Sequence, residues 1–131
     1  MKQKNKTGFS IKNRLLSFKY AFNGFKILFT EEHNSLIHAL ITIIVIVMGI
    51  TLNISFTEWL IILVLIALVF CLEIMNSSIE NLCNFISPKQ DESIKKIKDL
   101  SAAAVLTAAI ISLICGLIIF IPKICDFLIP K

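Results

Sequence analysis

Three long apolar segments dominate the chain. The first runs from Ser35 to Thr57, which is 23 residues without Asp, Glu, Lys or Arg. The second opens with 14 unbroken apolar residues, Trp59 to Leu72, and the third holds the 22 uncharged residues from Leu100 to Ile121. Because about 20 residues of helix cross the hydrocarbon core of a bilayer, the first and third segments are long enough to span it, whereas the second must continue through a polar stretch.

A fourth pattern precedes these segments. Apolar side chains recur at spacings of three and four between residues 9 and 30, and cations flank this stripe. The stripe consists of Leu15, Phe18, Phe22, Phe25 and Phe29, and the flanking cations are Lys12, Arg14, Lys19 and Lys26. Such a pattern is typical of a helix that lies in the membrane interface, and it is equally compatible with a helix that packs on the protein's own bundle.

Composition gives the same picture. Hydrophobic residues make up 56% of the 131 residues and charged residues 17%, with a mean hydropathy of +0.85. A globule of this size could not cover so much apolar surface, so ordinary soluble, disordered and DNA-binding proteins are excluded. The sequence predicts one all-α membrane domain over residues 1–131, with a surface helix at 9–30 and membrane helices at 34–55, 58–86 and 93–122.

The basic residues predict the orientation of these helices. Seven Lys and Arg residues precede the first apolar segment, none lies in the connection to the second, and the connection to the third contains Lys89, Lys95, Lys96 and Lys98. Since basic connections stay in the cytoplasm, we expect a multi-pass membrane protein with its N-terminus cytoplasmic and its C-terminus outside. The family resemblance described below implies that this membrane is the bacterial inner membrane.

Glu73 is the most informative residue, because a carboxylate within a membrane helix costs about 2.5 to 3.5 kcal/mol even on lenient scales. At 100° per residue, one helix face carries Glu73, Asn76, Ser77, Glu80 and Asn84. The second membrane helix therefore has a polar stripe at its cytoplasmic end.

Other charged residues are expected at the same membrane depth. Glu31 and Glu32 precede the first membrane helix, and Lys98 and Asp99 stand at the entry to the third. Carboxylates and amides suit Mg²⁺, and a basic connection suits a polyphosphate. The residues themselves leave three interpretations open, namely an enzyme, the ion site of a small transporter, and acidic residues that pair with lysines merely to fix packing. The four cysteines show no C-x-x-C spacing, so no metal cluster or disulfide framework is expected.

Two stretches carry a family resemblance. Glu73-Ile-Met-Asn-Ser-Ser-Ile-Glu80 and Lys98-Asp-Leu-Ser-Ala-Ala-Ala-Val105 resemble the signature E-x-x-N-[ST]-x-x-E, then A-K-D-x-x-A-A-A-V, of the prokaryotic diacylglycerol kinase and undecaprenol kinase family. The segments 18–24 and 32–38 are also similar to the family, and the resemblance covers residues 9–122. Two positions depart from it, since Asn84 stands where many members have aspartate and Leu36 where arginine is common.

The resemblance implies a small integral-membrane lipid kinase. It would form a homotrimer with sites between subunits, bind no nucleic acid, and transfer a phosphoryl group from ATP with Mg²⁺ to a membrane lipid hydroxyl. Undecaprenol is the favoured acceptor and diacylglycerol the alternative. The matched positions would then take three roles: general base for Glu73, magnesium ligands for Glu32 and Glu80, and groups that organise ATP for Asn76, Lys98 and Asp99.

Overall fold

The computed structural model describes residues 10–86 and 91–129. Four helices follow one another in this part of the chain, and it contains no strand: α1 (Ile11–Glu31), α2 (His33–Thr51), α3 (Phe56–Ile86) and α4 (Glu92–Leu128). The all-α fold class expected from the sequence is confirmed.

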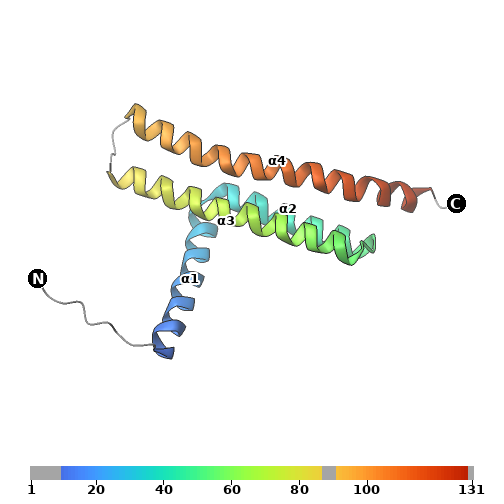
Figure 1. Cartoon of the computed structure of the whole chain (residues 1–131), viewed down its shortest axis with the longest axis horizontal. Coiled ribbons are helices and arrows are strands. Elements are labelled where there is room, and N and C mark those ends of the chain that lie inside the picture. Colours follow the sequence, from blue (N-terminus) through green and yellow to red (C-terminus); the bar gives the residue numbers. More distant parts are fainter. Residues whose placement is uncertain (1–9, 87–90, 130–131) are drawn as a thin grey trace, which may run out of the picture.

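The three later helices form an elongated bundle, and α1 leaves it sideways (Figure 1). α3 and α4 lie side by side in opposite directions, while α2 packs against α3. Each of these three helices is long and apolar enough to cross a membrane. Most of their large apolar side chains are exposed in the single chain. A bilayer, or another copy of the chain, must therefore cover them.

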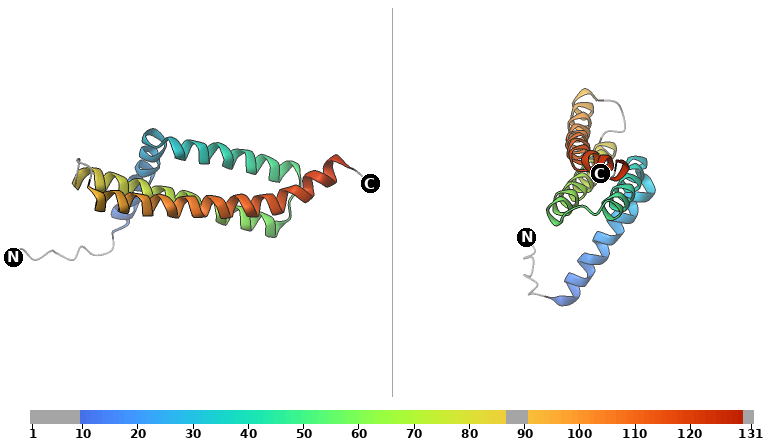
Figure 2. Two further views of the ribbon diagram at one scale, coloured as in Figure 1. Left: turned by 90° about the horizontal axis from the view of Figure 1, so that it is seen from above. Right: turned by 90° about the vertical axis from the view of Figure 1, so that its right-hand side faces the viewer.

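α3 is the helix that places the polar stripe. It runs without a break from the apolar stretch through the polar residues to Ile86, as crossing a bilayer requires. Its neighbour α4 differs from the expected end at residue 122, because it continues to Leu128 with Pro122 inside the helix. A proline removes one backbone hydrogen bond and bends a helix. In a membrane protein, the helix can continue beyond such a bend. Figure 2 shows the C-terminal part of α4 turning away from the helix axis.

The connection between α2 and α3 is packed tightly. Gly49 is buried against Trp59, and a Cβ at Gly49 would lie 2.8 Å from the indole ring. The carboxylate of Glu58 accepts a hydrogen bond from the Ser55 backbone N–H at 2.6 Å, and the Glu58 N–H donates to Ser55 Oγ at 3.3 Å, which is a capping box. Lys123 Nζ lies 3.5 Å from Glu58 Oε2 and ties α4 to the same end of the bundle.

A serine fixes the corner between α1 and α2. Ser35 Oγ is fully buried and lies within hydrogen-bonding distance of the Leu28 carbonyl, at 2.9 Å, and of the Glu32 carbonyl, at 2.7 Å. Glu32 itself has an extended backbone and separates the two helices. The corner therefore holds Glu32 at the point where α1 departs from the bundle.

Away from this corner, α1 does not pack on its own bundle. Leu28 is buried, whereas Leu15, Phe18 and Phe22 are 63% to 72% exposed. Figure 2 shows α1 projecting away from the other helices. Of the two interpretations of the aromatic stripe, the structure favours a helix whose apolar face is available to the membrane interface or to another chain.

Candidate active site

Glu73 lies on α3 with only 4% of its surface exposed. Its Oε1 atom is buried and has no hydrogen-bond partner within the described residues. The imidazole Nε2 of His38, on α2, lies 3.6 Å from this oxygen. The structure thus puts a carboxylate in the interior of an apolar bundle with a histidine from the neighbouring helix beside it.

Glu32 reaches the same region from the corner between α1 and α2. Its Oε1 accepts a hydrogen bond of 2.9 Å from Ser77 Oγ on α3, one turn after Glu73. Glu80 lies on the same face of α3, two turns after Glu73. Residues far apart in the sequence therefore form one polar cluster around Glu73.

Asn76 connects this cluster to α4. Its Nδ2 donates to Glu80 Oε1 at 3.3 Å, one turn further along α3. Its Oδ1 accepts a hydrogen bond from Ser101 Oγ, whose hydroxyl also lies 3.1 Å from the Lys98 carbonyl. The side-chain amide consequently bridges a carboxylate on its own helix and the beginning of the neighbouring helix.

Lys98, near the start of α4, lies beside the C-terminal end of α3. Its Nζ donates a hydrogen bond of 2.9 Å to Asn84 Oδ1. Asp99 differs from the other expected site residues, since it is exposed and its side chain has no hydrogen bond or ion pair with any other described residue. In the single chain, the structure brings Glu32, Glu73, Asn76 and Glu80 together, with Lys98 alongside and Asp99 outside their contacts.

Four further residues complete these contacts, and sequence reasoning gave none of them a role in the site. They are His38, Ser77, Asn84 and Ser101. Ser77 and Asn84 share the polar face of α3, and Ser101 follows Lys98 by three residues, so their helical spacing carried a signal. His38 carried only the weaker signal of being the single ionisable residue in the first apolar segment.

The donor set suits a hard cation that keeps part of its water shell. Glu32 and Glu80 each use one carboxylate oxygen in a hydrogen bond, and the second oxygen of each has no partner among the described residues. These residues include no cluster of three or more His, Cys, Asp or Glu side chains at metal-binding distances. Mg²⁺ is commonly held by one or two carboxylates together with the phosphates of a substrate, so two carboxylates fit it.

Comparison with known proteins supports the resemblance. The profile of the prokaryotic diacylglycerol kinase family matches residues 19–120. The chain is 38% identical over 108 residues to an undecaprenol kinase of Bacillus subtilis, covering 82% of this chain and 88% of the relative. It is 29% identical over 118 residues to a diacylglycerol kinase of Synechocystis sp., covering 89% of this chain and 67% of the relative. No solved structure matches the chain with significant similarity.

The three apolar helices, the polar cluster around Glu73 and the extent of the family match agree with one another. A kinase requires a nucleotide as co-substrate, and a bundle with an apolar exterior gives it access to a membrane lipid. The chain belongs to the prokaryotic diacylglycerol kinase family and is a membrane lipid kinase.

Proposed function

We propose that the protein transfers the γ-phosphoryl group of ATP to the hydroxyl of undecaprenol, which forms undecaprenyl phosphate and ADP. The 38% identity to the Bacillus subtilis undecaprenol kinase supports this acceptor. Diacylglycerol is the second candidate acceptor, because the Synechocystis relative carries the name diacylglycerol kinase.

The burial of Glu73 in an apolar bundle is the observation that carries the proposal. We assign Glu73 as the general base. The hydroxyl of a lipid dissolved in the membrane can approach at this depth, and the carboxylate accepts the hydroxyl proton as the new O–P bond forms and the bond to the leaving ADP breaks. His38, at 3.6 Å, holds the carboxylate in place.

The nucleotide takes the cytoplasmic side of the cluster. Asn76 and Lys98 are fixed there by hydrogen bonds to Glu80 and Asn84, which supports their role in organising ATP. The Lys98 ammonium stabilises negative charge on the phosphates. The family motif gives Asp99 the same role in organising ATP. Because its side chain is exposed, Asp99 is accessible to a nucleotide or to a neighbouring subunit.

Glu32 and Glu80 are the residues that would hold Mg²⁺. When bound, the ion neutralises charge on the phosphates. Ser77 and Asn76 orient the two carboxylates by their hydrogen bonds, and each carboxylate keeps one oxygen for the ion. The protein thereby supplies alignment and charge, which are the main requirements of phosphoryl transfer.

The proposed setting is the bacterial inner membrane, with the N-terminus and the connection between α3 and α4 in the cytoplasm and the C-terminus outside. The lysine and arginine residues on these segments support this orientation. We further propose a homotrimer. The exposed apolar faces of α1 to α4 support an assembly in which neighbouring chains complete each site.

The test is phosphorylation of purified lipids. The full-length protein in mixed micelles receives radiolabelled ATP with Mg²⁺ and either undecaprenol or diacylglycerol. We expect labelled undecaprenyl phosphate as the main product, and a turnover loss of about 10² to 10⁴ in Glu73→Gln with nucleotide binding retained. Glu58→Gln is the matched control, because Glu58 lies at the opposite end of α3. Cation flux into vesicles without ATP turnover would instead identify a transporter.

A further inference from the structure

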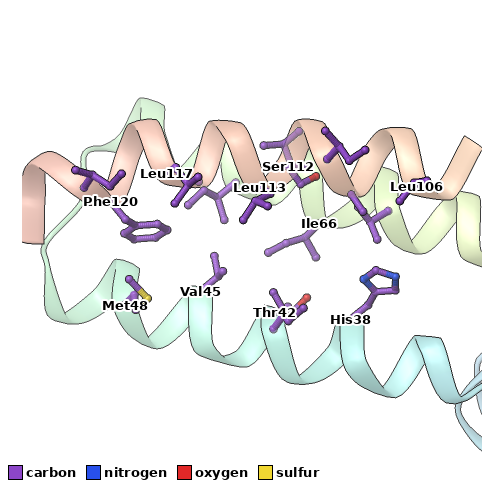
Figure 3. Close-up of a pocket in the computed structure, with 18 of the residues that line it drawn as sticks. His38, Thr42, Val45, Met48, Ile66, Leu106, Ser112, Leu113, Leu117 and Phe120 are labelled. Carbon is purple, nitrogen blue, oxygen red and sulfur yellow. The ribbon is translucent and has the colours of Figure 1, made fainter.

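A long apolar cavity lies between α2, α3 and α4, and nothing assigned so far uses it. Its volume is about 550 Å³, within the usual range of ligand sites. Almost all of the side chains that line it are apolar, and the polar ones are His38, Thr42 and Ser112. Figure 3 shows side chains of α2 and α4 facing each other across this space.

One end of the cavity is polar and adjoins the proposed reaction site. His38 lines the cavity and also lies 3.6 Å from Glu73. In Figure 3, His38 and Leu106 stand at one end, and Met48 and Phe120 at the other. A molecule that fills the cavity therefore has one end beside the carboxylate that accepts the proton.

The length of the cavity distinguishes between lipids. On α4 its lining extends from Leu106 to Ile124, which is about 27 Å of helix and nearly the full hydrocarbon thickness of about 30 Å. The acyl chains of a diacylglycerol remain in one leaflet and would occupy about half of this length. A polyprenol chain is long enough to continue through the far half.

We propose that this cavity binds the single polyprenyl chain of the acceptor alcohol, with the hydroxyl at the His38 end and the chain directed towards Phe120. This inference rests on the proposed function. Binding the chain along the bundle holds the hydroxyl beside Glu73, which lowers the entropic cost of bringing the reacting groups together. The site then selects a long, single-chain alcohol over a lipid with two chains.

Gly116 allows a direct test, because it lines the cavity and a Cβ built there meets no atom within 4 Å. A leucine at this position has room and would obstruct the cavity about 15 Å from Leu106. The matched control is Thr107→Leu, which enlarges an exposed residue of the same helix. The Thr107 hydroxyl donates a hydrogen bond only to the Ala103 carbonyl of α4, so its loss breaks no contact between helices.

The experiment measures kinetics of the full-length protein with undecaprenol and with farnesol, a short prenol. We expect Gly116→Leu to raise the KM for undecaprenol about tenfold and to leave the KM values for farnesol and for ATP unchanged. Thr107→Leu should behave like the wild type with both acceptors.

Two results would overturn the inference. The first is an unchanged KM for undecaprenol in Gly116→Leu, and the second is an equal loss with both acceptors. If that equal loss comes with a changed oligomeric state, a second copy of the chain is the occupant of the cavity. Failure of the proposed function is a different result, because there the wild type would not phosphorylate undecaprenol at all.

Discussion

His38 Nε2 lies 3.6 Å from Glu73 Oε1, across the contact between α2 and α3. Glu73 Oε1 has no hydrogen bond among the described residues, and the His38 contact lies in the range of an ion pair. We describe His38 as a positioning residue, because it is the side chain from α2 that meets the buried carboxylate.

Replacing His38 should impair turnover more than nucleotide binding. In His38→Gln, the carboxylate loses the partner that orients it, and a displacement of a reacting group by about 1 Å can cost about 100-fold in rate. We expect kcat to fall by about 10- to 100-fold, while the KM for ATP stays unchanged. The control is His33→Gln, because His33 is exposed at the start of α2. A wild-type kcat in His38→Gln would contradict the positioning role.

The two proposed magnesium ligands should shift the metal dependence of the reaction. Glu32→Gln and Glu80→Gln each remove one charged oxygen donor, so the Mg²⁺ concentration that gives half-maximal activity should rise by about tenfold or more. Titration of activity with MgCl₂ at constant free ATP measures this shift. Glu31→Gln serves as the control, since Glu31 is the exposed neighbour of Glu32. If all three variants share the wild-type magnesium dependence, another group holds the ion.

Lys98 should contribute to ATP binding. Lys98→Gln removes the positive charge that Asn84 holds in place at 2.9 Å, and we expect the KM for ATP to rise by about tenfold. Lys96→Gln is the matched control on the same helix, because Lys96 is exposed and its side chain has no hydrogen bond or ion pair with another described residue. Equal KM values for ATP in the two variants would remove Lys98 from the nucleotide site.

Packing at the connection between α2 and α3 predicts a stability difference between two glycines. Gly49→Ala places a methyl group 2.8 Å from the Trp59 ring, and such overpacking costs about 1 to 3 kcal/mol. Gly116→Ala places the same group in open space and should be neutral or stabilising, because alanine favours helix over glycine. Thermal unfolding in detergent compares the two, and an equal unfolding temperature would show that the connection relaxes without cost.

The helical content and the membrane class follow from local properties of the chain. The length and hydropathy of an apolar segment decide whether it spans a bilayer, and the period of the helix decides that Glu73, Asn76 and Glu80 share one face. The end of α4 was less well predicted, since Pro122 lies inside the helix although it is a common helix breaker.

The contacts between helices depend on how the helices pack. The helical period of one segment gives no information about that packing. Ser77 and Glu32 are 45 residues apart, and Asn76 and Ser101 are 25 residues apart, yet each pair is joined by a hydrogen bond. Asp99 belongs to the same sequence motif as Lys98 but is exposed in the single chain. Adjacency in a motif therefore did not imply contact in the fold.

The sequence by itself determined an all-α membrane protein with an acidic stripe on one helix, because hydropathy, length and helical period are properties of consecutive residues. Tertiary structure alone decided that His38 lies against Glu73, that Ser35 fixes the corner holding Glu32, and that an apolar cavity extends from this pair. These features depend on which faces of the helices meet, and that is fixed by packing among side chains distant in the chain.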